Sequence, residues 1–364
     1  MKNNFLRNVM YGYVSIFITS LLSFISVPLS LKYFGQELYG LFAITNDTLA
    51  YIALFNFGIP LAASIIFVKL KDYNNQKLIL KKALVILILI SILLLFLVFL
   101  IKSIFPNWIY FIGKISNNIV PIAKSFIIIS IIFYLVKLPF TLFGQLLIFM
   151  NKVYLSKLID TISAFVVFLC LILVIYLKWN ILHYAVLTGL SSLIALIITV
   201  FLFLQDWKGT QLEYDYDESQ NVSYKHLFSS SFYFFLNGIS VLLIWNTDNL
   251  IISHYLGLRM VAKYSLLFKF FMIIFMLINQ IMNAINPLYP KYYKDNQLNI
   301  LRDLFQLSSM VLTIIGGLIL LVIYGFFENF VYLWTNNSAI YIGDGACLVI
   351  GLYCYFLCFT IVPY

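Results

Sequence analysis

The sequence predicts an all-α integral membrane protein with about ten transmembrane helices, arranged as two tandem six-helix-type lobes of which the second is incomplete. Of the 364 residues, 63% are hydrophobic and 10% are charged, and the mean hydropathy is +0.99. Soluble domains carry roughly 25% charged residues, so this composition excludes a soluble protein. The net charge of +9 is typical of membrane proteins, and no basic-aromatic pattern indicates nucleic-acid binding.

The apolar runs define the expected helices, since a helix needs about 20 apolar residues to cross a bilayer. Loops between the runs are short, and none is large enough to fold as a soluble domain. The first run is too long for a signal peptide and has no small-residue cleavage site, so we expect it to stay in the membrane. The ten expected spans are 9–31, 39–68, 83–101, 119–149, 158–177, 182–204, 227–252, 264–287, 304–324 and 346–364.

The distribution of positive charge predicts the orientation. If the N-terminus is cytoplasmic, the inside segments carry 14 Lys and Arg residues and the outside segments carry six. Cytoplasmic loops are enriched in Lys and Arg, so we expect a cytoplasmic N-terminus.

Short matches at a nearly constant offset indicate an internal repeat. Tyr33-Phe34-Gly35 follows the first span and matches Tyr255-Leu256-Gly257 after the seventh, 222 residues later. Pro139-Phe140 matches Pro363-Tyr364 at an offset of 224. Because six spans per repeat preserve the orientation, the two halves would be parallel repeats.

The repeat predicts the domain organisation. We expect an N-terminal six-helix lobe over 1–204, a cytoplasmic linker over 205–226 and a C-terminal lobe of four helices over 227–364. The second half ends within its fourth span, at a position that matches Phe140 of the first half. We therefore expect the sequence to be truncated.

Polar residues share one face on each of two repeat-related helices. Over Ser229–Ile252 of the seventh span, an acid and several hydroxyl or amide groups fall on one side, and the first span has a similar face. Such faces line a hydrated cavity or allow close helix packing, and their occurrence on both helices favours a central cavity. They comprise Gly12, Ser15, Thr19, Ser23, Ser26 and Ser30 on the first span, and Ser230, Tyr233, Asn237, Ser240 and Asp248 on the seventh.

Four charged residues lie within the predicted spans, namely Asp47, Lys137, Asp248 and Lys269. A charge at bilayer depth costs at least ~2.5–3.5 kcal/mol, so it is normally paired or hydrated. Asp248 and Lys269 have similar expected depths in the membrane, which is compatible with a structural ion pair between them. For Lys137, the alternative is that its side chain extends along the helix so that its ammonium reaches the membrane interface. Cations in a cavity would suit an anionic substrate such as a phosphate-bearing headgroup, whereas Asp47 and Asp248 are candidates for binding a coupling proton or sodium ion. The candidate cavity set is Ser15, Ser26, Asp47, Lys137, Asn237, Asp248 and Lys269.

We expect no catalytic residues, no metal site and no cofactor. The cysteines lie inside apolar runs without a nearby cluster of His or carboxylates, so they are interpreted as small apolar residues. They are Cys170, Cys347, Cys354 and Cys358.

Three segments resemble those of Wzx-type polysaccharide repeat-unit flippases: Pro28–Ile44, Leu54–Pro60 and Thr247–Lys269. This family belongs to the multidrug/oligosaccharidyl-lipid/polysaccharide exporter superfamily, with multidrug-and-toxin extruders and lipid II flippases. The resemblance implies two six-helix lobes in a V shape and identifies Asp248 as the acid of the seventh-helix motif. Asp47, Lys137 and Lys269 are inferred from the residues alone.

The resemblance implies a flippase that is not an enzyme. It would move undecaprenyl-pyrophosphate-linked oligosaccharide units across the bacterial inner membrane by alternating access, for O-antigen, lipopolysaccharide or other surface polysaccharide. A polysaccharide polymerase and a chain-length regulator would be partners. One alternative is a cation-coupled multidrug exporter of the same fold. Another is a membrane polymerase or ligase, for which the outer loops 102–118 and 325–345 carry few catalytic candidates.

Overall fold

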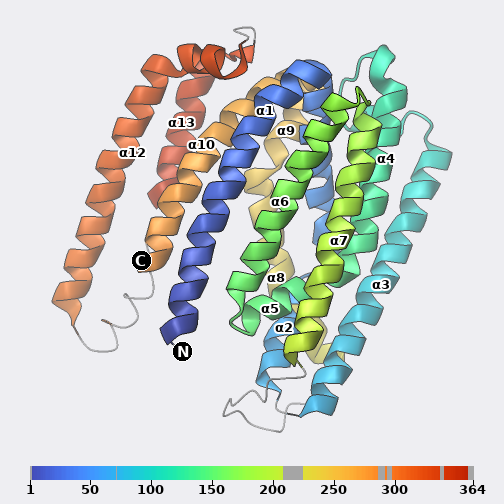
Figure 1. Ribbon diagram of the computed structural model, residues 1–364, viewed down its shortest axis with the longest axis vertical. Coiled ribbons are helices and arrows are strands. Elements are labelled where there is room, and N and C mark those ends of the chain that lie inside the picture. Colours follow the sequence, from blue (N-terminus) through green and yellow to red (C-terminus); the bar gives the residue numbers. More distant parts are fainter. Residues whose placement is uncertain are drawn as a thin grey trace. The chain divides into compact units, whose positions relative to one another are not determined.

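A computed structural model describes residues 2–70, 72–207, 224–285, 292, 297–336 and 340–359 of the chain. Within these ranges the protein is all-helical and has no strand (Figure 1). The predicted all-α class is therefore confirmed. The α-helices are α1 (Lys2–Ala53), α2 (Ile59–Lys69), α3 (Tyr73–Ile104), α4 (Val120–Lys137), α5 (Thr141–Phe149), α6 (Val153–Tyr176), α7 (Ile181–Trp207), α8 (Tyr224–Trp245), α9 (Thr247–Leu256), α10 (Leu258–Ile285), α12 (Leu298–Thr335) and α13 (Asp344–Phe359). Four short 3-10 helices join them: η1 (Leu54–Asn56), η2 (Trp108–Phe111), η3 (Asn117–Ile119) and η4 (Leu138–Phe140).

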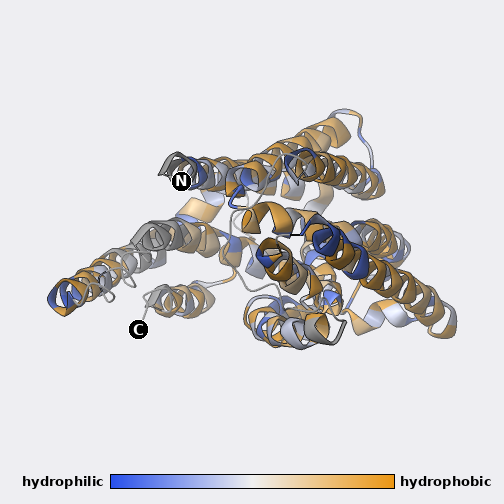
Figure 2. Ribbon diagram, turned by 90° about the horizontal axis from the view of Figure 1, so that it is seen from below, coloured by the Kyte–Doolittle hydropathy of each residue, from blue (hydrophilic) through white to orange (hydrophobic). Residues whose placement is uncertain are grey.

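The helices carry the surface of a multi-pass membrane protein. In the described residues, seven helical stretches are long and apolar enough to cross a bilayer. Most of the helical ribbon is hydrophobic (Figure 2). On α3, Leu89 and Phe96 are 61% and 62% exposed, and a large apolar face of this kind is stable when lipid covers it.

The first two expected spans, 9–31 and 39–68, meet at a sharp bend within α1. Gly35 has φ 80° and ψ 171°, a conformation that essentially only glycine adopts, and helix continues on both sides of it. Gly257 separates α9 from α10 with nearly the same angles, φ 85° and ψ 174°. These two glycines were matched in the sequence repeat, and their shared conformation agrees with it.

The second expected span is interrupted before it ends. Helix α1 stops at Ala53, and η1 and two left-handed residues, Phe57 and Gly58, precede α2. Gly58 also lies against α8, because a Cβ on it would come within 2.6 Å of the Phe234 Cβ. The sequence pattern missed this break because the segment stays apolar throughout.

The chain forms two compact units that do not follow the chain order. Unit 1 contains the described residues up to Ser15 together with Leu41–Val261, and unit 2 contains Ile16–Gly40 and the described residues from Ala262 onward. The predicted division into lobes over 1–204 and 227–364 rests on the repeat and stays a prediction.

Unit 1 is built around α7, which packs against both α4 and α6, while α2 packs against α5 (Figure 1). At one end of these helices an aromatic cluster joins Phe67, Phe203 and Trp207. The indole of Trp207 donates to the Gln76 side chain over 2.8 Å, which ties α7 to α3. These contacts join α2 and α3 to α7, which also packs against α4 and α6.

Unit 2 packs the Ile16–Gly40 part of α1 with α10, α12 and α13. Trp334 stacks on Phe24 with a centroid distance of 4.3 Å, and its indole donates to the Phe24 carbonyl over 3.1 Å. Cys347 and Cys354 are buried in the same core, in agreement with their interpretation as apolar residues.

Candidate functional site

Lys137 occupies a helix break in unit 1 that the sequence itself creates. It is the last residue of α4, and Leu138–Phe140 form the 3-10 helix η4 before α5 begins at Thr141. Pro139 lacks an N–H and disfavours regular α-helix just before it, which accounts for a break at this point. The side chain of Lys137 therefore projects from a bend and not from a straight helix.

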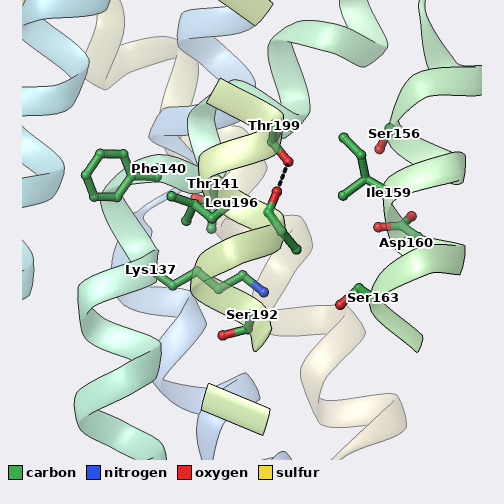
Figure 3. A pocket seen from close by; sticks show the side chains of 12 residues that line it. Lys137, Phe140, Thr141, Ser156, Ile159, Asp160, Ser163, Ser192, Leu196 and Thr199 are labelled. Atoms are coloured by element: carbon green, nitrogen blue, oxygen red, sulfur yellow. Dashed lines mark hydrogen bonds between the residues drawn. The ribbon is translucent and has the colours of Figure 1, made fainter. Parts of the chain in front are cut away.

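A polar pocket opens beside this bend, with a volume of about 220 Å³. Three walls enclose it: the α4–η4–α5 bend, one face of α6 and one face of α7 (Figure 3). The lining residues on α6 and on α7 fall at positions i, i+3, i+4 and i+7, so each helix contributes a single stripe. The pocket is lined by Lys137, Phe140, Thr141, Gly144, Ser156, Ile159, Asp160, Ser163, Ser192, Ala195, Leu196 and Thr199.

The pocket contains one cation and one anion. Figure 3 shows the Lys137 ammonium pointing into the pocket near Ser192 and Ser163, with Asp160 on the facing helix. In the described part of the chain, Lys137 makes no hydrogen bond or close ion pair, and Asp160 is the opposite charge that acts on it. The Asp160 carboxylate also lies 3.5 Å from the Lys157 ammonium. The pocket therefore presents a carboxylate as well as an ammonium and is not lined by positive charge alone.

Two threonine hydroxyl groups of the pocket are oriented as acceptors. Thr141 donates to the Leu138 carbonyl over 2.7 Å, and Thr199 donates to the Ala195 carbonyl over 2.8 Å. A hydroxyl whose proton is used this way still offers its lone pairs. These oxygens can accept hydrogen bonds from a ligand.

Asp160 was not among the sequence candidates. It lies near the start of the fifth expected span, where an acid is readily assigned to the membrane interface. The signal that could have found it is the spacing of Ser156, Asp160 and Ser163, which places three polar groups on one face of an apolar helix.

A second polar cluster in unit 1 surrounds Asp47 on α1. This buried carboxylate accepts hydrogen bonds from Asn246 over 2.8 Å and from Asn249 over 2.7 Å, one at each oxygen. Asn246 stands between α8 and α9, and Asn249 belongs to α9. Nearby, Tyr51 and Thr247 are joined by a hydroxyl–hydroxyl bond of 2.9 Å. The cluster connects α1 to the α8–α9 junction.

The partners of Asp47 are neutral amides. Among the described residues no cation pairs with it, and Asp248 is near enough to repel it electrostatically. A buried carboxylate in that setting gains from binding a proton or a small cation. The geometry can thus serve ion binding, and it also fastens two helices together.

The other predicted site residues occupy separate places. In unit 1, Ser15 is buried where α1 crosses α6, donating to the Lys157 carbonyl over 3.1 Å. Asn237 on α8 and Asp248 on α9 are exposed.

In unit 2, Ser26 is half-buried, and its hydroxyl donates a hydrogen bond to the Leu22 carbonyl of its own helix over 2.7 Å. Lys269 on α10 is half-buried. The structure brings Asp47 close to Asp248 and does not place Ser15 or Asn237 at the Lys137 pocket. Their membership of a substrate cavity stays a prediction.

A loop contact fixes one end of α9 within unit 1. The backbone N–H of Lys114 donates to the Ser253 carbonyl over 2.9 Å. The side-chain ammonium of Lys114 donates to the Tyr255 carbonyl over 3.0 Å. Gly113 permits this approach, because a Cβ there would lie 1.7 Å from the Ser253 Oγ. The α3–α4 loop is therefore docked on the C-terminal end of α9.

Two family models match the sequence. Residues 5–293 match the family described as polysaccharide biosynthesis protein, and residues 234–364 match the family described as MatE. No curated protein sequence matches this chain significantly.

Solved structures of MATE and MOP-superfamily transporters share the fold. A MATE protein crystallised in complex with MaL6 is 14% identical with a TM-score of 0.65, and the match covers 99% of this chain and 81% of that one. A mutant of the Vibrio cholerae MATE transporter VcmN is 12% identical with a TM-score of 0.66, covering 99% and 82%. A MOP superfamily transporter from Pyrococcus furiosus is 11% identical with a TM-score of 0.58, covering 99% and 81%.

Proposed function

Because the chain belongs to the polysaccharide biosynthesis protein family, we propose that it flips undecaprenyl-pyrophosphate-linked oligosaccharide units across the bacterial inner membrane. It is a multi-pass membrane transporter of the MOP superfamily. The proposal adds the substrate, the direction from the cytoplasmic to the outer leaflet, and a role in O-antigen or other surface polysaccharide synthesis. A polymerase and a chain-length regulator would act on the product.

The observation that carries this proposal is the pocket around Lys137. It combines an ammonium, a carboxylate and several hydroxyl groups inside helices that are otherwise apolar. A sugar presents many hydroxyls and little net charge, and such a site can bind it through paired donors and acceptors. A pocket that binds apolar organic cations would instead present a carboxylate without a neighbouring cation and more aromatic side chains.

The depth of the pocket supports entry from the cytoplasm. Asp160 lies seven residues into α6, which begins at Val153, and Thr199 lies eight residues before the end of α7 at Trp207. At 1.5 Å per residue these positions are about 10–12 Å from those helix ends. With the predicted cytoplasmic N-terminus, both ends face the leaflet in which the lipid-linked substrate is presented.

In this mechanism the oligosaccharide headgroup enters the hydrated interior while the polyprenyl tail remains in lipid. No covalent bond changes. A ligand that binds both states equally shifts nothing, so direction requires an ion gradient or removal of the product. We propose Asp47 as the coupling group, since its amide partners leave its charge uncompensated. Asp248 would contribute to the same region.

A cation-coupled drug exporter is the second candidate. The match of residues 234–364 to MatE and the uncompensated carboxylate of Asp47 favour it. Whole cells separate the two functions. A deletion strain complemented with wild type should regain surface polysaccharide, and strains with Lys137→Met or Asp248→Asn should not, at equal protein level. Efflux of ethidium that is independent of polysaccharide genes would instead establish the exporter.

A further inference from the structure

We propose that the Lys137–Asp160 pocket is a subsite for one neutral pyranose ring of the transported headgroup. This inference rests on the proposed function and adds to it the part of the substrate that the pocket binds. It assigns the pocket to a sugar ring and not to the pyrophosphate. Four features of the pocket carry it: its size, the presence of both an ammonium and a carboxylate, its apolar wall and an open glycine.

The size of the pocket suits one ring. Sites for drug-sized ligands occupy roughly 300–1,000 Å³. A cavity of about 220 Å³ is smaller than these and larger than the space of a few water molecules, which take ~30 Å³ each. A single monosaccharide can enter with its glycosidic neighbours extending through the open side.

The charges favour a neutral polyhydroxylated ligand over an anion. A phosphate or carboxylate that approaches Lys137 also meets the Asp160 carboxylate on the opposite wall. A ring hydroxyl is both donor and acceptor, so one hydroxyl can accept from Lys137 while another donates to Asp160. The oxygens of Thr141, Ser192 and Thr199, whose protons are used on helix carbonyls, can accept further hydroxyl protons.

The remaining walls match the apolar face of a pyranose. Phe140, Ile159 and Leu196 line the pocket between the polar groups. A pyranose presents ring C–H groups on its faces and hydroxyls around its rim. The alternation of apolar and polar lining residues therefore corresponds to the amphipathic surface of a sugar and not to that of a hydrophobic drug.

Gly144 keeps the space open. It lies on α5, and a Cβ built on it has no protein atom within 4 Å. Glycine is among the least favourable residues in a helix interior, and neither a left-handed φ nor a close protein contact requires it here. A larger side chain at this position would occupy the pocket without disturbing the fold, which gives a clean steric test.

The experiment measures direct binding of sugars to the purified full chain in detergent. Saturation-transfer NMR would use methyl glucoside, methyl galactoside, methyl mannoside and N-acetylglucosamine as neutral probes, with glucuronate and inorganic phosphate as anionic ones. The variants are Gly144→Leu, which fills the pocket, and Asp160→Asn, which removes the anion. Gly325→Leu is the matched control, because Gly325 lies on α12 outside the pocket and its Cβ position is also open.

We expect at least one neutral glycoside to bind the wild type saturably, and Gly325→Leu to bind it equally. Gly144→Leu should abolish binding, and Asp160→Asn should weaken it by about tenfold or more, since hydrogen bonds to a charged group are the stronger ones. The inference is overturned if no neutral glycoside binds, if phosphate or glucuronate binds better, or if Gly144→Leu binds like wild type. If it is overturned while reconstituted protein still flips lipid-linked oligosaccharide, the subsite is wrong and the proposed function stands.

Discussion

Replacing Lys137 by methionine removes the only ammonium that lines the pocket in the described structure. Methionine has a similar length and no charge, so it preserves the volume of the side chain. Asp160 keeps the Lys157 ammonium at 3.5 Å, and Lys137 makes no protein hydrogen bond to lose among the described residues. The fold should therefore tolerate the change, and removing a desolvated ammonium from an apolar lobe lowers a cost of insertion.

The expected loss appears in transport. A hydrogen bond to a charged group contributes roughly 1.5–3 kcal/mol. Losing one bond between Lys137 and the substrate should lower the initial flipping rate at subsaturating substrate by roughly 10- to 150-fold. Lys137→Arg, which keeps the charge and a donor, should lose less.

The assay is flipping of fluorescent lipid-linked oligosaccharide in proteoliposomes, with thermal unfolding of the same preparations as a folding control. Lys124→Met is the matched variant, because Lys124 also lies on α4 but donates to the Pro106 carbonyl over 2.7 Å outside the pocket. A Lys137→Met rate equal to that of Lys124→Met, with both proteins folded, would refute the role of Lys137 in the pocket.

Three further predictions follow from the clusters and glycines. Asp47→Asn keeps the size of the side chain and removes its charge, so flipping should no longer respond to an imposed proton or sodium gradient; an unchanged response would contradict the coupling role. Gly113→Val places atoms on Ser253 and should break the loop contact, lowering unfolding stability by about 1–2 kcal/mol in thermal scans, and an unchanged midpoint would argue against the docked loop. Gly35→Ala should lower the free energy of unfolding by ~1–3 kcal/mol, because alanine is strained at these backbone angles. Gly144→Ala, in a regular helix, should leave that free energy unchanged or raise it by up to ~1 kcal/mol. Equal thermal midpoints for the two variants would contradict the bend at Gly35.

The sequence predicted well what depends on composition and local pattern. The all-helical class follows from apolar runs, and the sequence repeat paired Gly35 with Gly257, which share one backbone conformation. Charge at membrane depth is costly wherever it occurs, so Asp47 and Lys137 could be selected as unusual without any structure.

What the sequence did not predict depends on which helix faces meet. Ser15 carries the same polar signal as a cavity residue, yet its hydroxyl is used against α6. Asn246 and Asn249 became partners of Asp47 only because α9 lies beside α1, almost 200 positions away along the chain. Asp160 adds a carboxylate to the pocket of Lys137, whereas the cation taken alone had favoured an anionic headgroup. A residue's environment is set by its neighbours in space, which a single apolar pattern does not specify.

The most direct test of the account is the initial rate at which purified protein in sealed vesicles moves lipid-linked oligosaccharide between leaflets. We predict a rate well above that of empty vesicles, and a much lower rate in Lys137→Met and in Gly144→Leu. A rate equal to that of empty vesicles, from folded protein that moves organic cations instead, would contradict it.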